Sequence, residues 1–213
     1  MREAFTVYSF CCAIDRVLAI IHMIQSSSPL APLLSAVMTL RDLSAVPLCD
    51  AQWLAASEPV LRQLLADDGW LPDSHATSHP QYYQQHVLHI DAQQRFSISS
   101  FVWGPAQGTP VHDHTIAGWV GVLRGAELCQ RYSADGRVKR GAELRLNPGD
   151  MGAVSPSDAA IGDVHTVRNA YDDRNSVSIH LYRGNIAGTP RSVYADGVLK
   201  PFSSGYSGAA ALV

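Results

Sequence analysis

Cysteine is scarce in this sequence, and none of it is arranged to bind a metal. The 213 residues contain four cysteines, at positions 11, 12, 49 and 129. No two of them form a C-x-x-C pair, and they do not cluster with the nine histidines. This usage is typical of free thiols in a reducing compartment, and it predicts a cytoplasmic protein.

An excess of charge of one sign is also missing. Sixteen basic and 19 acidic residues are interspersed, for a formal net charge of -3. This balance gives no electrostatic basis for binding nucleic acid or an anionic membrane surface, so we expect neither partner. Hydrophobic residues make up 46% and charged residues 16%, which indicates a folded globular chain long enough for one substantial core.

Long hydrophobic runs are absent as well. The segment VLAIIHMI (17–24) is similar to the apolar part of a secretory signal, but Glu3, Asp15 and Arg16 precede it and no small-residue cleavage site follows. It is too short to span a bilayer. We therefore expect an N-terminal helix, although the sequence leaves open whether residues 1–25 form a native ordered helix.

The first part of the chain, residues 1–75, is expected to form a helical layer. Ser28 can cap a helix with Pro29 at its first position, and APLLSAVMTLRDL continues at helical spacing. Ser57 and Pro59 predict the start of another helix. Its apolar stripe is core and consists of Leu61, Leu64 and Leu65.

From residue 76 onward, short alternating or apolar runs replace the helical period. Turn signals such as ADGR and NPGD separate them, which predicts an all-β sandwich or barrel. No long helices alternate with these runs, so a parallel α/β sheet is disfavoured. The fold class is therefore mainly β, with a β-barrel over 76–213 and the helical layer packed on it in one structural domain. The strands are expected at 95–103, 119–124, 127–132, 137–146, 150–155, 164–168 and 176–182.

Two histidines lie one residue apart in TPVHDHT. In an extended chain, His112 and His114 project from the same side, as ligands of a shared metal would. The alternative is a solvated strand face that happens to carry two histidines. A third histidine, His165 in GDVHTVRN, lies at the start of a later strand, and His180 lies in SVSIHLY.

These two segments resemble the signature motifs of the cupin superfamily, whose fold is a jelly-roll β-barrel. Many cupins have a glutamate ligand four residues after the second histidine, where this chain has Gly118. Three neutral imidazoles leave a divalent metal its full charge and open positions, which suits Fe(II) that must bind both a substrate and O2. The missing glutamate and SIHLY narrow the resemblance to the cysteine dioxygenase family of thiol dioxygenases, closest to the bacterial 3-mercaptopropionate dioxygenases, over about residues 80–207. It implies that His112, His114 and His165 are the Fe(II) ligands.

Ser178, His180 and Tyr182 alternate on one face of the strand that contains SVSIHLY. Such a row can form a hydrogen-bond relay that orients the phenol toward the metal, and the resemblance implies this catalytic role. The alternative is an ordinary strand with a solvated polar face. Related animal enzymes crosslink a cysteine to the tyrosine, but Gly118 occupies that place here, so Tyr182 is expected to be unmodified.

The resemblance also implies how the thiol substrate is selected. No arginine occurs in HPQYYQQHVLH, where animal-type enzymes have one to pair with the carboxylate of cysteine. Gln85 takes that place, and Arg191 in GTPRSVY is the matching candidate on the other side; chemically, Gln84 is an equally good glutamine. The neighbouring His86 and His89 are interpreted as peripheral.

The sequence thus predicts an enzyme that adds both atoms of O2 to the thiol of a small mercapto-carboxylic acid, giving a sulfinic acid, with 3-mercaptopropionate favoured. One alternative is a cysteine dioxygenase that converts L-cysteine to cysteine sulfinic acid. Others are a cupin isomerase or decarboxylase that uses Mn or Zn, and a non-catalytic metal-binding sensor. The physiological thiol and the oligomeric state stay open.

Overall fold

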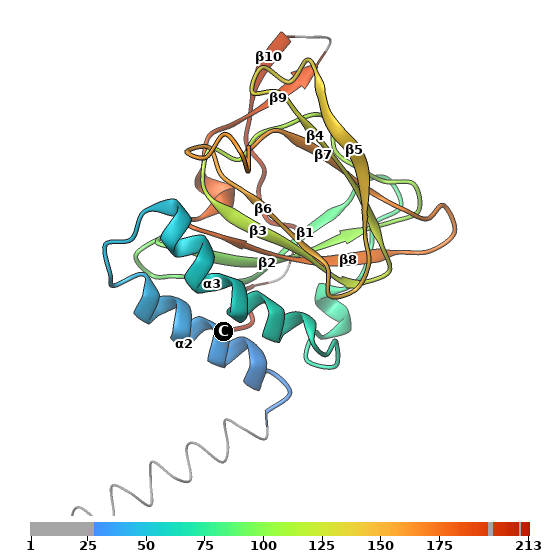
Figure 1. Cartoon of the computed structure of the whole chain (residues 1–213). Coiled ribbons are helices and arrows are strands. Elements are labelled where there is room, and N and C mark those ends of the chain that lie inside the picture. The colour runs from blue at the N-terminus through green and yellow to red at the C-terminus, as the bar shows by residue number, and fades with distance from the viewer. Residues whose placement is uncertain (1–27, 196–197, 209) are drawn as a thin grey trace, which may run out of the picture.

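A β-barrel with two helices against one side makes up the computed structural model, which describes residues 28–195, 198–208 and 210–213 (Figure 1). The helix expected around 17–24 lies outside the described residues. None of the helices within these ranges is long and apolar enough to cross a membrane.

The first described helix, α2 (Ala31–Leu43), begins later than expected. The segment before it is a tight turn in which the Ser28 carbonyl accepts the N–H of Ala31 and the Ser28 hydroxyl accepts the N–H of Leu30. Pro32, rather than Pro29, therefore lies in the first turn of the helix. The predicted start was wrong by about half a turn, because Ser28 stabilises the turn before the helix.

The second helix, α3 (Asp50–Leu65), is longer than predicted and contains Ser57 and Pro59 in its interior. The expected start at Ser57 was wrong because Trp53 and Leu54 already face the core one turn earlier. Their burial outweighs the backbone hydrogen bond that Pro59 cannot donate. The predicted core stripe is confirmed: Leu61, Leu64 and Leu65 are all buried.

Within the described residues, ten strands form three antiparallel sheets. Strands β1 (Gln84–Ile90), β2 (Ser97–Trp103), β8 (Ser176–Tyr182), β3 (Gly118–Arg124) and β6 (Met151–Val154) form a five-stranded sheet in this order. A three-stranded sheet has the order β5 (Lys139–Leu146), β4 (Glu127–Tyr132), β7 (His165–Asn169), and β9 (Arg191–Ala195) pairs with β10 (Val198–Phe202). Short 3-10 helices lie at Asp73–His75 and Ile186–Gly188.

All seven predicted strands form, within about two residues of their expected ends. The sequence analysis missed β1, β9 and β10. Two of these interrupt their apolar residues with polar ones, and β10 contains Pro201, so none gives a clear strand pattern.

Strand β8 lies in the middle of the five-stranded sheet, between β2 and β3, and every residue in it is buried. Val177, Ile179 and Leu181 belong to one hydrophobic cluster with the buried leucines of α2 and α3. Helix α3 approaches so closely that a Cβ on Gly121 of β3 would lie 2.4 Å from Leu65. The alternate side chains of β8 point into the barrel.

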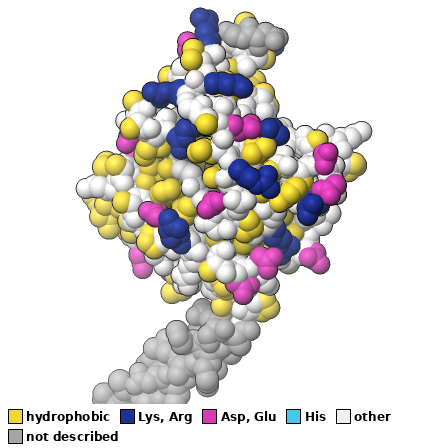
Figure 2. Space-filling view, turned by 45° about the vertical axis from the view of Figure 1, so that its right-hand side comes forward, with side chains coloured by type: hydrophobic (Ala, Val, Ile, Leu, Met, Phe, Trp, Pro, Cys, Tyr) yellow, Lys and Arg dark blue, Asp and Glu magenta, His cyan; other side chains and the backbone are white. Residues whose placement is uncertain are grey.

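The predicted fold class, mainly β with an antiparallel barrel and an N-terminal helical layer, is confirmed by this topology. The two helices share their core with the barrel. On the face seen in Figure 2, acidic and basic side chains are interspersed with apolar ones, and no large area of one sign gathers there.

Candidate metal centre

Three buried histidines meet inside the barrel. The backbone N–H groups of His112 and His165 each donate to the carbonyl of the other at 3.0 Å, so these residues form a hydrogen-bonded antiparallel pair. His114 projects to the same spot from two residues further on. One possible ligand atom from each of the three lies within 4.8 Å of the others. Within the described ranges, this is the one group of three or more such side chains placed to share a metal ion.

The His112–His114 pair lies on an extended connection before β3, not in a regular strand. His112 forms single bridges to His165 and to Val193. The extended backbone ends at Thr115, whose φ is 59°. The extended geometry that brings i and i+2 to one side therefore holds here without a continuous ladder.

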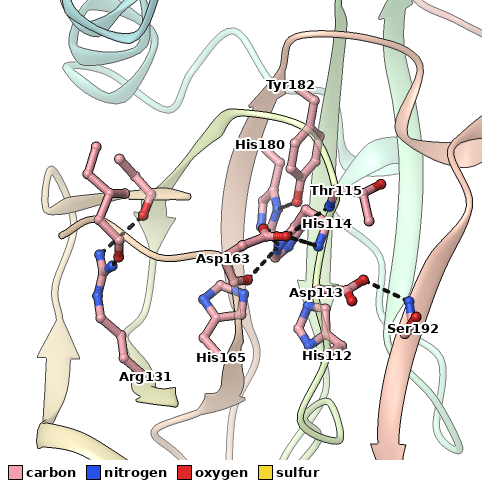
Figure 3. Close-up of polar contacts among 12 residues, drawn as sticks. His112, Asp113, His114, Thr115, Arg131, Asp163, His165, His180, Tyr182 and Ser192 are labelled. Atoms are coloured by element: carbon pink, nitrogen blue, oxygen red, sulfur yellow. Dashed lines mark hydrogen bonds and ion pairs between the residues drawn. The ribbon is translucent and has the colours of Figure 1, made fainter. Parts of the chain in front are cut away.

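Each of the three rings uses Nδ1 for a contact with the protein, and Figure 3 shows that of His114 with Asp163. His112 Nδ1 lies 3.1 Å from the carbonyl of Pro110, and His114 Nδ1 lies 3.1 Å from Asp163 Oδ1. His165 Nδ1 faces the Cys129 sulfur at 3.6 Å. Partners at Nδ1 fix the ring orientation and leave Nε2 of each ring for a metal ion.

Asp163 is a supporting residue that the sequence analysis missed. Its carboxylate accepts the backbone N–H of His114 at 3.1 Å and that of Thr115 at 2.9 Å, in addition to the ring contact. Burial raises the pKa of this carboxyl, but the hydrogen bonds from His114 and Thr115 outweigh burial and lower it. Asp163 is therefore ionised, and its hydrogen bonds with the backbone and ring of His114 orient that ring. The available signal was its position two residues before His165.

The neighbouring Asp113 turns away from the three histidines. Its carboxylate accepts the N–H of Ser192 at 2.7 Å and the hydroxyl of Tyr194 at 3.1 Å. Asp113 thus links the histidine segment to β9, as Figure 3 shows for Ser192.

Two of the three buried rings, His112 and His165, are held in the neutral form that a metal ion requires. Burial, reinforced by the neighbouring His114, lowers the pKa of His112 to about 3. Burial, reinforced by the neighbouring His112 and His114, also lowers the pKa of His165. A set of three neutral imidazoles could hold a divalent metal ion such as zinc, iron or nickel.

No fourth ligand can be placed at Gly118. A Cβ there would lie 2.5 Å from Tyr182 Cδ1 and 2.8 Å from the carbonyl of Leu181, because Gly118 and Tyr182 are paired across β3 and β8. The phenol ring occupies the space that a glutamate or cysteine side chain would need. Tyr182 in turn stacks near His114, with ring centroids 5.5 Å apart.

Ser178, His180 and Tyr182 form a continuous hydrogen-bonded row. The Ser178 hydroxyl lies 2.9 Å from His180 Nε2, and His180 Nδ1 lies 2.9 Å from the Tyr182 hydroxyl. The indole N–H of Trp103 donates to Ser178 Oγ at 3.2 Å. All of these side chains are buried, and burial lowers the pKa of His180 and raises that of Tyr182. Both rings are therefore neutral, and the row can orient the phenol.

A cavity of about 210 Å3 opens beside the histidines. It is smaller than the pockets that hold drug-sized ligands, so it suits a small molecule. Its walls are mainly aromatic and aliphatic, and the rings of Phe101 and His180 stack with their centroids 3.8 Å apart. The lining residues are Tyr83, Phe101, Trp103, Thr109, Pro110, His112, His114, His165, Val167, His180, Tyr182, Arg191, Val193 and Phe202.

Arg191 lines this cavity as a buried cation. Its side chain lies over the ring of Phe202, and Nη2 donates to the hydroxyl of Ser204. Among the described residues, no carboxylate pairs with it, and its Nε has no hydrogen-bond partner. A buried cation without an anion is costly, so the cavity favours an anionic ligand.

Gln85 is buried but does not line the cavity. Ser204 donates to Gln85 Oε1 at 3.0 Å, so Ser204 joins Gln85 to Arg191. Gln84 is half-buried, and its amide donates only to the carbonyl of the preceding residue. Of the two glutamines, Gln85 is therefore the one connected to the site. The connecting Ser204 was not foreseen, because it lies beyond β10.

His86 and His89 lie away from the centre, as interpreted from the sequence. Their Nδ1 atoms contact the carbonyls of Ser207 and Val213 in the C-terminal segment.

Comparison with solved structures finds distant similarities. No family model matches the sequence. A protein with a double-stranded β-helix domain from Klebsiella pneumoniae is 16% identical, with 54% of this chain and 88% of that chain covered at a TM-score of 0.42. A cupin-like protein from Thermotoga maritima is 17% identical, with 56% of this chain and 84% of that chain covered at a TM-score of 0.42. An oxalate oxidase in complex with glycolate is 16% identical over 56% of this chain and 61% of its own, with a TM-score of 0.41.

Proposed function

We propose that this protein is a non-heme Fe(II) thiol dioxygenase. It would convert R–SH and O2 to the sulfinic acid R–SO2H, where R carries a carboxylate and 3-mercaptopropionate is the favoured substrate. Both oxygen atoms enter the product and the sulfur supplies all the electrons, so no external reductant is needed. The observation that carries this proposal is the presence of a three-histidine group and an unpaired buried arginine on one small cavity.

The donor set fits Fe(II). His112, His114 and His165 offer three neutral nitrogens and no carboxylate, so a bound ion would keep its charge and several open positions. Fe(II) held there would supply adjacent binding positions for a thiolate and for O2. The role of the chain is to orient the substrate, exclude water and hold the proton of the phenol.

Arg191 is proposed to bind the carboxylate of the substrate. Its guanidinium lines the same cavity as the histidines, so a ligand that pairs with it places its other end near them. Gln85 acts through Ser204, which holds the guanidinium in place. A guanidinium pairs with a carboxylate through two parallel charge-assisted hydrogen bonds, which fixes the position of a short substrate.

Tyr182 is proposed to donate a hydrogen bond into the cavity. Its hydroxyl is fixed by His180, and its ring is fixed against Gly118. The aromatic walls keep water away, which strengthens a hydrogen bond from the phenol to a polar group of the substrate or of O2. Tyr182→Phe should therefore retain iron but slow turnover.

The decisive experiment is oxygen uptake by the Fe(II)-loaded protein with 3-mercaptopropionate and with L-cysteine side by side, with product sulfinate measured in parallel. A higher kcat/KM for 3-mercaptopropionate, with one O2 consumed per sulfinate formed, is expected. Protein loaded with Mn or Zn is the matched control and should take up no oxygen.

The other outcomes separate the alternatives. A preference for L-cysteine would favour a cysteine dioxygenase and reject Arg191 and Gln85 as selectors of the shorter acid. Absence of uptake with either thiol, despite bound iron, would reject the proposal in favour of a metal-binding sensor or another cupin chemistry.

A further inference from the structure

Glu127, the first residue of β4, is a buried carboxyl group that the proposed mechanism does not use. It pairs with Asn169 of β7 and Leu146 of β5, and its exposed fraction is 0%. Among the described residues, neither carboxyl oxygen makes a hydrogen bond of good geometry, although Ser178 and Trp103 lie close enough to favour its ionised form. A buried acid without partners is rare in proteins and calls for an explanation.

Glu127 lies beside the residues at the far end of the relay: its cross-strand partner Asn169 donates to the carbonyl of Trp103 at 3.1 Å, and the indole of Trp103 donates to Ser178. Glu127 and Cys129 share the face of β4 that points into the barrel, where Cys129 contacts His165. Ser178 and the indole of Trp103 are the two groups whose hydrogen-bonding capacity acts on Glu127. Trp103 already donates to Ser178 Oγ, and the Ser178 hydroxyl also contacts His180. Glu127 and His180 therefore compete for the hydroxyl proton of Ser178.

In the part of the chain that the structure describes, no cation stabilises an ionised Glu127. The groups that face it are Trp103 from β2, Ser178 from β8, Asn169 from β7, Leu146 from β5 and the Cys129 thiol on its own strand, and none is a cation. Burial raises the pKa of Glu127 to about 8, although Ser178 and Trp103 partly offset this rise. Burial also raises the pKa of Cys129 to about 11, so the thiol stays neutral. Glu127 can thus be either neutral or ionised at mildly alkaline pH.

We propose that the protonation state of Glu127 sets the direction of the hydrogen bonds along the Ser178–His180–Tyr182 row, and so decides whether the Tyr182 hydroxyl donates into the cavity. The proposal follows from what each group can donate or accept. Its effect on turnover rests on the proposed function, whereas the direction of the bonds is a property of the chain itself.

With Glu127 neutral, Ser178 accepts from Trp103 and donates to His180 Nε2. His180 is then protonated on Nδ1 and donates to the Tyr182 oxygen, which leaves the phenol O–H free to point into the cavity.

With Glu127 ionised, the carboxylate takes the proton of the Ser178 hydroxyl as its hydrogen bond. His180 must then carry its proton on Nε2 and donate to Ser178, and its Nδ1 accepts from Tyr182. The phenol donates away from the cavity. Tyr182 stays neutral in both states, so only the polarity of the row changes.

The test is ¹⁵N NMR of histidine-labelled, metal-free protein from about pH 6 to about pH 9.5, a range that brackets the pKa of Glu127. ¹⁵N shifts distinguish Nδ1–H from Nε2–H imidazole, and the His180 signals are assigned by their loss in His180→Asn. Wild type should change from the Nδ1–H to the Nε2–H tautomer across this range. Glu127→Gln should show no change, because an amide cannot ionise.

Two further variants sharpen the test. Glu143→Gln removes an exposed acid on β5 that pairs with Arg168 and should titrate like wild type. Ser178→Ala removes the link between Glu127 and His180 and should abolish the change of tautomer. A wild-type His180 that keeps one tautomer throughout, or a Glu127→Gln protein that still switches, would overturn the inference.

The same variants separate this inference from the proposed function. A tautomer switch in a protein without thiol-dependent oxygen uptake would support the relay and reject the dioxygenase. Oxygen uptake in a protein whose His180 does not switch would reject only the role of Glu127.

Discussion

The two faces of strand β8 show how one short segment can carry both stability and chemistry. Val177, Ile179 and Leu181 pack against the helices and make no polar contact. The residues between them form the hydrogen-bonded row that ends at Tyr182. Both faces are equally dry, so burial alone does not distinguish them. What differs is whether the buried atoms need hydrogen-bond partners.

This contrast has a physical consequence. An apolar face tolerates changes that keep volume, whereas a buried polar row tolerates few changes, because each lost partner leaves another group unsatisfied. Mutations on the outer face should therefore affect stability, and mutations on the inner face and its surroundings should affect metal binding or turnover.

The largest effect is expected at the metal ligands. His114→Ala removes one of three nitrogens, so the metal content per chain after Fe(II) loading should fall to background. The thermal unfolding midpoint of the metal-free protein should change little. Metal analysis by mass spectrometry and thermal unfolding test this, and a variant that retains stoichiometric iron would remove His114 from the ligand set.

The opposite result is expected on the outer face of the same sheet. Ile179 is fully buried, so Ile179→Ala should lower the free energy of unfolding by about 2–5 kcal/mol, from lost burial and the cavity left behind. Iron content should be preserved in the folded fraction. Urea denaturation measures the first quantity, and loss of iron without loss of stability would contradict the separation of the two faces.

Glu127 should make stability depend on pH. Its folded pKa, about 8, lies above that of a carboxyl in an unfolded chain, so its contribution is fully present below the unfolded pKa and is lost as pH rises to about 8. Glu127→Gln removes this loss. The stability of the variant relative to wild type should therefore rise by up to a few kcal/mol between about pH 4.5 and about pH 8. Thermal unfolding across this range measures the difference, and an equal rise in Glu143→Gln would assign it to another group.

A moderate effect is expected where Gly118 meets the inner face. Gly118→Ala places a Cβ 2.5 Å from Tyr182, so the ring must shift, at a cost of about 1–3 kcal/mol. Turnover should fall more than KM rises, because the phenol moves while Arg191 does not. Gly152→Ala on β6 is the matched control, since a Cβ there meets nothing within 4 Å. Equal turnover in the two variants would show that the place of Tyr182 does not matter.

The sequence predicted the alternation of β8 because a strand repeats every two residues, and it predicted the His112–His114 pair because these residues lie one residue apart in an extended segment. The third member, His165, was implied by the family resemblance. It also identified the absence of a ligand at Gly118, but not its reason, which is the pairing of Gly118 with Tyr182 across two strands. The choice between Gln84 and Gln85 depended on which face of β1 points inward. A shift of one residue reverses that face, so periodicity alone could not decide it.

Asp163, Ser204 and Glu127 show the limit more clearly. Each acts on a residue at least 13 positions away in the sequence or on another strand. Apart from the position of Asp163 two residues before His165, no local pattern marks them. The predicted start of helix α3 was wrong for a similar reason, because burial of Trp53 in the tertiary structure overrode the local signal of Pro59. Contacts between residues on different strands can be located only once the order and pairing of the strands are known.

The smallest effect is expected at Ser204, which joins Arg191 to Gln85 from outside the barrel strands. Ser204→Ala removes one hydrogen bond to each of them but leaves the guanidinium over Phe202, so it should raise KM for 3-mercaptopropionate about fivefold, corresponding to about 1 kcal/mol. The kcat should stay the same, and a thiol without a carboxylate, such as 2-mercaptoethanol, should be unaffected. Ser203→Ala, at an exposed neighbouring residue, is the matched control. An equal rise in KM for both thiols would mean that Ser204 shapes the cavity and does not position the carboxylate-binding arginine.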